Sequence, residues 1–319
     1  MKKEILPDLY TIEIPLPGNP LKALNSYIIK ASDRNLMIDT GFNRKECFEA
    51  MQEGLKELDV DLNKTDIFLT HLHADHTGLV SRLATDSSTI YFNRPDADSK
   101  GGWDHMLVCA GENGFPENQL EAAFKNHPGY KYSPETAPDY TILEDGDKVD
   151  IGAYHFECVQ TPGHTRGHMC LYDEAKKLFI SGDHILIDIT PNIACFSEDE
   201  DPLHDYLNSL DRVDKLDIDL VLPGHRRVMD DHRARIQELR VHHRHRADEV
   251  LEILKKGPLN AFQIASQMTW DITFPTWDMF PVSQKWFATG EAIAHLRFLE
   301  SNGEIKRDRQ GKVYTFSIN

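Results

Sequence analysis

The sequence predicts an α/β fold, and three observations lead to this prediction. Short apolar runs, such as residues 67–69 and 220–222, have the length and composition of buried strands. Several of these runs end at a glycine followed by histidine or aspartate. Between them, segments such as residues 44–58 repeat apolar residues at near-helical spacing. The 319 residues are enough for one large domain and one small domain.

The remaining elements follow in chain order. The sequence predicts early strands at residues 9–14, 24–30 and 35–39, and helices near 44–58, near 117–126, from Pro202 onward and over 231–256. Nearer the C-terminus it predicts helices at 261–268 and 289–302, and then a hairpin formed by residues 303–307 and 311–316. Asn260 and Gln263 form a capping-box pattern before the first of these two helices.

The tract from Thr70 to His76 contains three histidines and an aspartate within six residues, directly after an apolar run. Imidazole and carboxylate groups are the usual ligands of zinc, iron and manganese. The spacing suits a strand end that turns into a loop, because a helix would scatter these side chains around its axis. A solvated histidine-rich surface is the plain alternative, but the entry from a strand and the exit to a helix favour a metal site.

A metal ion needs further ligands, and three candidates follow apolar runs downstream. They are His164, Asp183 and His225, and a glycine precedes each of them. Glycine allows the tight turn and close backbone approach that a packed ligand set requires. Taken singly, these residues also fit a capped turn, a helix N-cap and a loop histidine. Together with the histidine tract they predict one shared metal centre.

These motifs, with Asp39 in Met37-Ile38-Asp39-Thr40-Gly41, resemble the metallo-β-lactamase superfamily over residues from about 10 to 230. The resemblance implies a four-layer αββα sandwich with metals at one edge of the two sheets. It implies that one metal binds His71, His73 and His164, and a second binds Asp75, His76 and His225. Asp183 would bridge the two metals. Asp39 would support the site without binding metal, and Asp75 would orient the attacking hydroxide.

The resemblance also narrows the chemistry. Aspartate at position 183, in place of cysteine, departs from the antibiotic-destroying zinc β-lactamases and resembles the glyoxalase-II-like branch. The expected cofactors are two divalent metal ions, with zinc preferred and iron or manganese as alternatives. The expected reaction is hydrolysis of a small thioester, ester or lactone, in which a hydroxide bridging the metals attacks the substrate.

Three other functions stay open at this stage. Some winged-helix relatives cleave RNA, which makes a metal-dependent endoribonuclease or phosphodiesterase the first alternative. A mononuclear iron dioxygenase acting on sulfur compounds uses similar ligands around one metal. A nucleic-acid-binding regulator with a structural metal site is the third, and the complete ligand set makes it the weakest.

We divide the chain into a catalytic domain at residues 1–240 and a winged-helix-like domain at residues 241–319. The second domain resembles the C-terminal domain that a group of metallo-β-lactamase-like hydrolases carries. Segments 93–145 and 186–203 lie beside the ligand motifs, and segment 93–145 interrupts the strand pattern. Segment 93–145 is a candidate lid or pocket wall, with a covering loop without catalytic role as the equal alternative. His184, Trp103 and Trp277 are candidate substrate contacts, with packing as the plain alternative for each. Arginines and histidines between 231 and 246 form a basic tract, which we interpret as a solvated or salt-bridged helix face, with recognition of a phosphate or carboxylate on the substrate as the alternative.

Composition limits the partners. The net charge of −17 opposes non-specific binding to nucleic acid and to anionic membranes. No apolar stretch is long enough to span a membrane, and the N-terminus lacks the apolar core of a signal peptide. Five cysteines without paired spacing favour reduced thiols, so we expect a cytoplasmic protein. The expected partner is a small, anionic substrate, and the oligomeric state stays open, a homodimer included.

Overall fold

The structure is a computed structural model, and it describes residues 2–99, 102–271 and 273–319. A seven-stranded sheet contains β1 (Lys2–Leu6), β2 (Leu9–Pro15), β3 (Ala23–Lys30), β4 (Asn35–Ile38), β5 (Thr65–Phe68), β6 (Ile90–Asn93) and β7 (Thr141–Leu143), in that order. A five-stranded sheet contains β8 (Lys148–Ile151), β9 (Tyr154–Gln160), β10 (Met169–Asp173), β11 (Leu178–Gly182) and β12 (Leu220–Pro223), in the order β12-β11-β10-β9-β8. Both sheets mix antiparallel pairs with parallel ones, such as β4 with β5 and β11 with β12.

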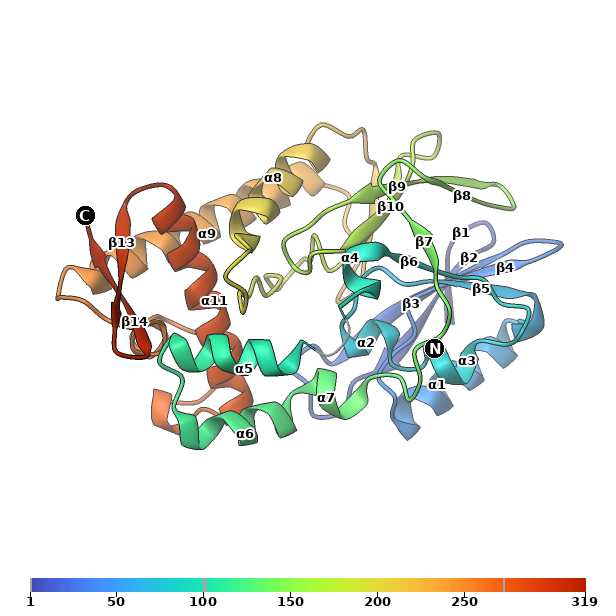
Figure 1. Cartoon of the computed structure of the whole chain (residues 1–319). Helices are drawn as coiled ribbons and strands as arrows, with labels where there is room; N and C mark the ends of the chain where they lie inside the picture. Colours follow the sequence, from blue (N-terminus) through green and yellow to red (C-terminus); the bar gives the residue numbers. More distant parts are fainter. Residues whose placement is uncertain (1, 100–101, 272) are drawn as a thin grey trace.

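The helices are distributed around these sheets (Figure 1). They are α1 (Lys45–Glu57), α2 (Ala74–Thr77), α3 (Val80–Leu83), α4 (Arg94–Ala97), α5 (Trp103–Glu112), α6 (Glu117–Asn126), α7 (Pro128–Tyr132), α8 (Pro202–Val213), α9 (His232–Leu254), α10 (Ala261–Ala265) and α11 (Val282–Ser301). Short 3-10 turns lie at Leu62–Lys64 and Trp277–Met279. No helix among the described residues combines the length and apolar character needed to cross a membrane.

Three separate apolar cores divide the molecule into four layers. The two sheets face each other through buried side chains such as Phe68 and Phe156. Helix α1 covers the outer face of the larger sheet, and its Met51 belongs to the same core as Ile67. Helices α8 and α9 cover the outer face of the smaller sheet, where Tyr206 shares a third core with other buried residues. This arrangement confirms the predicted αββα sandwich.

Helix α1 illustrates how the sequence produces a layer. Its Cys47, Met51 and Leu55 are buried and lie four residues apart, on one face of the helix. Each such side chain contributes roughly 1.5–3 kcal/mol when it leaves water. The exposed remainder of the helix is polar, with Glu46 in its first turn and Lys56 in its last. The predicted range of 44–58 agrees with the observed helix within one residue at each end.

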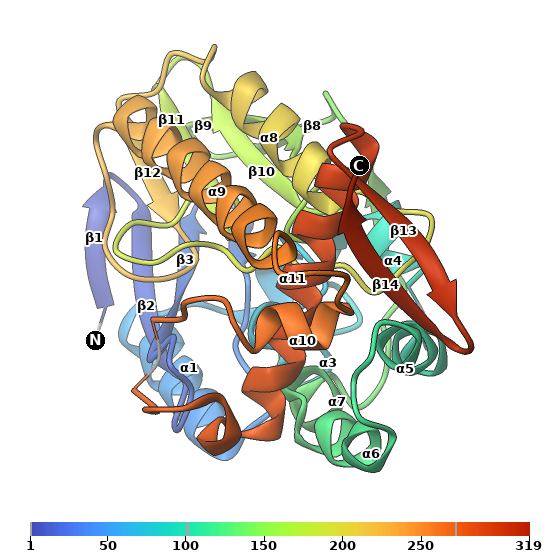
Figure 2. The ribbon, with the colours of Figure 1, turned by 90° about the vertical axis from the view of Figure 1, so that its left-hand side faces the viewer.

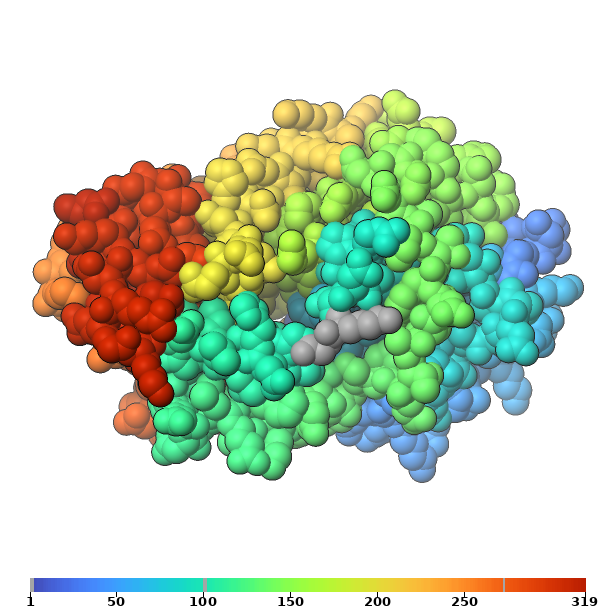
Figure 3. All heavy atoms as spheres, viewed as in Figure 1, coloured from blue at the N-terminus to red at the C-terminus, as the bar shows by residue number. Residues whose placement is uncertain are grey.

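The segment between β6 and β7 forms helices α4 to α7, of which α5 and α6 lie beside the C-terminal part (Figure 1). Trp103 and Phe124 contact each other, and Trp103 also contacts His127. His127 in turn contacts Phe287 of α11. In the space-filling view, this segment (blue-green to green) adjoins the red C-terminal part of the chain (Figure 3). The segment that was predicted to interrupt the strand pattern is therefore largely helical, and it packs against the C-terminal part.

The C-terminal part contains the end of α9, helices α10 and α11, and a two-stranded hairpin of β13 (Ile305–Gln310) and β14 (Val313–Ile318) (Figure 2). The capping box at Asn260 and Gln263 is present, as predicted. Helix α11 begins at Val282, seven residues before the predicted start at 289, because Trp286 and neighbouring residues join the core as helix residues. The proposed domain boundary at residue 240 falls inside the continuous helix α9, and the boundary stays a prediction.

The basic residues of α9 are largely engaged within the chain. Arg233 donates to the carbonyl oxygens of Asp214 and Leu216, and Arg240 pairs with Asp211 and Asp214. Arg235 donates to the carbonyl oxygens at 186 and 189 and pairs with a glutamate on its own helix. These contacts agree with the salt-bridged helix face expected from the sequence.

His295 on α11 leads to a prediction about acid stability. Its Nδ1–H donates to the Glu291 carbonyl oxygen at 2.9 Å, and its Nε2 accepts from His243 Nδ1 at 3.3 Å, so the ring is neutral. Complete burial, together with Arg246, lowers the pKa of His295 to about 4. Because an unfolded histidine has a pKa of about 6.5, this ring stabilises the fold fully above that pH. The contribution is lost as the pH falls from about 6.5 toward 4.

We therefore expect His295→Gln to flatten the dependence of unfolding free energy on pH by roughly 3 kcal/mol between pH 6.5 and 4. Chemical denaturation at several pH values measures this slope. The exposed His155, which pairs with Asp150, provides the control substitution His155→Gln. An unchanged slope in His295→Gln would contradict the assignment.

Candidate metal centre

The predicted ligands lie at the ends of strands from both sheets. The tract from His71 to His76 follows β5, and its last residues form the short helix α2. His164 lies in the loop after β9. Asp183 directly follows β11, and His225 lies in the turn after β12. Strands that end at one edge deliver their following loops to the same place. The fold thus brings together residues that are more than 150 positions apart in the sequence.

The side chains form three overlapping groups in which one ligand atom from each residue lies within 4.8 Å of the others. These groups are His71, His73 and His164; His71, His76 and Asp183; and Asp75, His76 and His225. Two of them are the ligand sets that the resemblance implies for the two metals. All seven predicted ligands therefore converge on one centre.

Asp183 lies between the two ends of this centre. Its Oδ2 is 3.6 Å from His164 Nε2 and 3.5 Å from His225 Nε2, and its Oδ1 is 3.6 Å from His76 Nε2. The carboxylate is 4% exposed. A position shared by ligands from both groups is what a bridging carboxylate requires.

Hydrogen bonds fix which ring nitrogen each histidine presents. His76 Nδ1 donates to Asp39 Oδ2 at 2.7 Å, and His225 Nδ1 donates to the Ala23 carbonyl oxygen at 2.7 Å. His164 Nδ1 donates to the Asn192 carbonyl oxygen at 2.8 Å. Each of these rings therefore directs Nε2 into the centre, which is the usual arrangement in metal sites.

Asp39 occupies the supporting position that the sequence analysis gave it. Besides His76, its carboxylate accepts from the Thr70 backbone N–H at 2.9 Å and from the Thr70 hydroxyl at 2.8 Å. Its backbone has a φ of 61°, in the left-handed region that aspartate tolerates better than most residues. Asp39 therefore anchors the start of the histidine tract and orients one of its rings.

The electrostatics of the centre suit a cation. Burial, with His164 nearby, lowers the pKa of His73 to about 3, which leaves its imidazole neutral. Burial opposes ionisation of Asp75, but His76 and His225 lower the pKa of that carboxyl to about 2. Burial likewise opposes protonation of His225, but Asp183 and Asp75 raise the pKa of this ring to about 10. A bound divalent cation would take the place of that proton.

Four buried atoms of this centre have no hydrogen-bond partner: His76 Nε2, His164 Nε2, His225 Nε2 and Asp183 Oδ1. Leaving buried polar atoms unpaired costs about 1–3 kcal/mol each. Divalent metal ions would satisfy all four, and imidazole with carboxylate is a donor set that zinc, iron and manganese accept. The residues present therefore fit the metals that the resemblance implies.

The structure adds a histidine that the sequence analysis missed. His168 is fully buried, and its Nε2 accepts from the Asp183 backbone N–H at 3.1 Å. Its Nδ1 donates to the Thr161 hydroxyl at 2.8 Å. This ring holds the backbone of the bridging aspartate in place. The repeated Gly-His pair, at 163–164 and again at 167–168, is the sequence signal that could have identified it.

The three candidate substrate contacts lie in packed surroundings. His184 is fully buried and contacts the ring of Tyr206. Trp103 packs within the segment of α5 to α7, and Trp277 contacts the rings of Phe262 and Phe280. Their role toward substrate stays a prediction.

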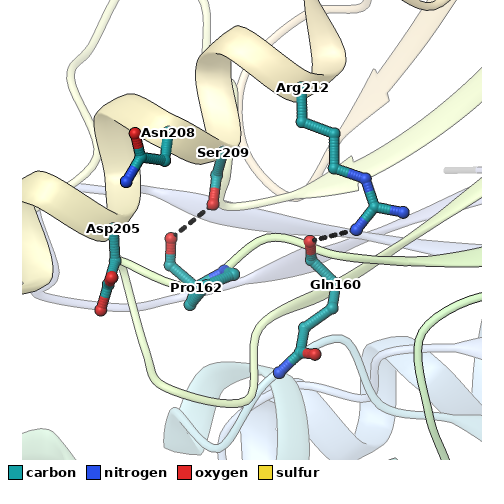
Figure 4. A pocket seen from close by; sticks show the side chains of 6 residues that line it. All are labelled: Gln160, Pro162, Asp205, Asn208, Ser209 and Arg212. Carbon is teal, nitrogen blue, oxygen red and sulfur yellow. Dashed lines mark hydrogen bonds between the residues drawn. The ribbon is translucent and has the colours of Figure 1, made fainter.

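Two hollows border the loops of the centre. A shallow one of about 310 Å³ lies where α8 meets the loop that leads to His164 (Figure 4). There Ser209 Oγ donates to the Pro162 carbonyl oxygen and Arg212 donates to that of Gln160, so these side chains fasten the loop. A larger cavity of about 880 Å³ is lined by residues of α9 and α11, Phe287 among them, and by loop residues that include Asn192 and Trp270. Asn192 is also the residue whose carbonyl oxygen holds His164.

Comparisons with known proteins agree with this geometry. A family model described as the metallo-beta-lactamase superfamily matches residues 21–225, and one described as a metallo-beta-lactamase-like C-terminal domain matches residues 247–318. The chain is 28% identical to the probable metallo-hydrolase YqjP of Bacillus subtilis, over 97% of each chain. It is 26% identical to the human acyl-coenzyme A thioesterase MBLAC2, over 63% of this chain and 72% of that protein.

Solved structures show the same architecture along the whole chain. A metallo-beta-lactamase family protein from Thermus thermophilus is 26% identical, with a TM-score of 0.83 over 99% of this chain and all of the other. A beta-lactamase domain protein from Burkholderia ambifaria is 25% identical, with a TM-score of 0.85 over all of this chain and 94% of the other. The chain belongs to the metallo-beta-lactamase superfamily and is a metal-dependent hydrolase.

Proposed function

We propose that the protein hydrolyses a thioester, ester or lactone of a small molecule at a centre of two divalent cations, with zinc as the best-suited metal. The observation that carries this proposal is Asp183, which lies between the His71–His73–His164 group and the Asp75–His76–His225 group. When bound, the cations would supply an activated water near neutral pH and Lewis-acid stabilisation of negative charge on the substrate.

The residues of the chain have separate roles in this proposal. The histidine rings hold the cations through nitrogens that their backbone and carboxylate partners orient. Asp75 remains ionised at neutral pH, and its Oδ2 lies 3.3 Å from His225 Nε2 at the edge of the centre. That oxygen can accept a hydrogen bond from the attacking water and direct its lone pair toward the substrate carbon.

A thioester is the substrate class that we favour. Two relatives named for thioester hydrolysis support it: the human acyl-coenzyme A thioesterase, and an atrochrysone carboxyl ACP thioesterase of Aspergillus fumigatus that is 25% identical over 73% of this chain. The cavity of about 880 Å³ beside Asn192 has the size of a small-molecule pocket. We propose that this cavity receives either the acyl part of the thioester, which becomes the acid product, or its thiol leaving group.

The partners are likewise proposals. We propose a small, anionic substrate drawn by the cations, in preference to nucleic acid. The net charge of −17 and the engaged arginines of α9 support this choice over the ribonuclease alternative. We also propose that the winged-helix-like C-terminal part either packs against the catalytic part or encloses substrate. A cytoplasmic location and a homodimer remain proposals of the same kind.

A substrate panel tests the proposed function. We expect the zinc-loaded protein to hydrolyse at least one acyl thioester, ester or lactone with kcat values about 10²–10⁴-fold above those of Asp75→Ala. Metal analysis on the same samples should give two ions per chain. Equal turnover by wild type and Asp75→Ala over the whole panel would refute the proposal. One iron per chain with oxygen uptake on a persulfide would favour the dioxygenase, and cleavage of single-stranded RNA would favour the nuclease.

A further inference from the structure

A buried carboxylate outside the ligand set connects two of the loops that carry the metal ligands. Asp96 lies in the four-residue helix α4, directly after β6, and is 4% exposed. Neither the ligand motifs nor the proposed reaction uses it. Nothing in its sequence surroundings, Asn93-Arg94-Pro95-Asp96, indicates a role.

Asp96 accepts three hydrogen bonds from two different loops. Its Oδ2 accepts from the Leu72 backbone N–H at 2.8 Å and from the Thr165 hydroxyl at 2.8 Å. Its Oδ1 accepts from the Gly167 backbone N–H at 2.7 Å. Leu72 lies between His71 and His73, and Thr165 directly follows His164. One carboxylate therefore joins the loop after β5, in the larger sheet, to the loop after β9, in the smaller sheet.

The site is built closely around this carboxylate. A Cβ atom added at Gly167 would lie 2.6 Å from the Asp96 backbone nitrogen and 2.7 Å from its Cγ, so the second loop reaches Asp96 only because residue 167 is glycine. Among the described residues, no lysine, arginine or histidine pairs with Asp96. All three of its partners are donors. A carboxylate, whose two oxygens both accept, satisfies all three donors at once.

These contacts have a specific consequence for the ligands. His71, His73 and His164 form one of the three groups whose ligand atoms converge, although they come from two different sheets. The hydrogen-bond contact within this group, between His71 Nε2 and His73 Nδ1 at 3.1 Å, lies inside a single loop. The ring of His164 meets those two rings edge-on, with centroids 4.8 and 4.5 Å away. Asp96 supplies hydrogen bonds that connect that loop with the loop of His164.

We propose that Asp96 is a positioning residue that sets the spacing between the His71–His73 pair and His164, and thereby the affinity of the three-histidine metal site. The proposal rests on the metal centre proposed above. Asp96 acts through the backbone of its neighbours and touches neither metal nor substrate. Groups that orient metal ligands in this indirect way commonly change metal affinity by 10–100-fold when they are replaced.

The substitution Asp96→Asn tests the proposal, because it preserves shape but turns one acceptor into a donor. With the amide oxygen toward Leu72 and Thr165, the NH₂ group faces the Gly167 N–H, and in the flipped orientation the amide nitrogen faces the Leu72 N–H. We expect the zinc dissociation constant, measured by competition with a chromophoric chelator, to rise about 10–100-fold. The visible spectrum of the cobalt-substituted protein should change as well, because it reports ligand geometry.

The matched control is Asp66→Asn. Asp66 is 9% exposed, accepts from the Thr89 backbone N–H at 2.7 Å and pairs with Arg34, but it lies on β5 and contacts no ligand loop. Both variants should lose thermal stability in the metal-free state, whereas only Asp96→Asn should lose zinc affinity. Thus a merely structural role would leave the zinc affinity of Asp96→Asn equal to that of wild type, and this result would overturn the proposal.

A second variant covers the case in which Asp96→Asn does not fold. Thr165→Val removes one of the three donors while preserving the branched side chain, and we expect a smaller loss of zinc affinity in the same direction. Unchanged affinity in Thr165→Val would then count against Asp96. A wild-type protein that binds neither zinc nor cobalt in the titration would instead refute the metal centre itself, which is a different outcome from equal affinities.

Discussion

Replacing Asp183 by alanine should remove most of the bound metal and lower kcat/KM by at least about 1000-fold, which corresponds to about 4 kcal/mol of transition-state stabilisation. The reason is its position, because its two oxygens lie within 3.6 Å of ring nitrogens of His76, His164 and His225. In the proposed two-metal centre, this substitution would leave the two ligand groups without the carboxylate that lies between them. Metal content by elemental analysis, together with turnover of the best panel substrate, measures both effects.

Asp188→Ala provides the control for this prediction. Asp188 lies five residues further along the same loop, is exposed, and pairs with Arg227 at the surface. Its removal should leave both metal content and turnover close to those of wild type, since surface ion pairs contribute about 0–1 kcal/mol. If Asp183→Ala retained two metals per chain and its activity, the assignment of the bridging ligand would be wrong.

Replacing Trp286 by alanine should destabilise the protein by about 3–5 kcal/mol, the cost of removing a large aromatic side chain from a core. Trp286 is 1% exposed and stacks on Phe196, with ring centroids 4.4 Å apart and planes 17° apart. Its ring also contacts Phe115. It therefore joins α11 to the loop before α8 and to the segment after α5. Denaturant unfolding with Val241→Ala as an exposed α9 control measures the effect.

This loss of packing should also reach the metal centre. The loop that contacts Trp286 carries Asn192, which holds His164 and whose side chain approaches Glu291 of α11 at 3.4 Å. Cys195 of the same loop donates its backbone N–H to the Gly290 carbonyl oxygen at 3.0 Å. We expect the zinc affinity of Trp286→Ala to fall together with its stability. A destabilisation below about 1 kcal/mol would contradict the packing role.

Much of the site could be predicted from the sequence because its residues stand in local patterns. The tract from His71 to His76 combines ligand type, spacing and a preceding strand, so it identifies itself without reference to the rest of the chain. His164, Asp183 and His225 each follow a glycine at the end of an apolar run. The layers were predictable for a related reason, since periodic burial, as in α1, is written into consecutive residues.

The supporting residues lacked such patterns. Asp96 is hydrogen-bonded to residues that lie 24, 69 and 71 positions away from it in the sequence, and no local spacing encodes those contacts. Asn192 acts through its backbone carbonyl oxygen, which every residue possesses. The early start of α11 was missed for a different reason. An aromatic residue such as Trp286 suits either a loop or a buried helix face, and its distant contacts with Phe196 and Phe115 determine that it belongs to the helix.

The spread of the ligands along the chain has a consequence for biosynthesis. The ligands extend from residue 71 to residue 225, and β12, the strand before His225, pairs with β11 in the smaller sheet. A ribosome-bound chain that ends before residue 225 lacks a ligand and the strand that delivers it. The complete centre therefore cannot form until most of the chain has been made, and full metal capture follows the assembly of both sheets.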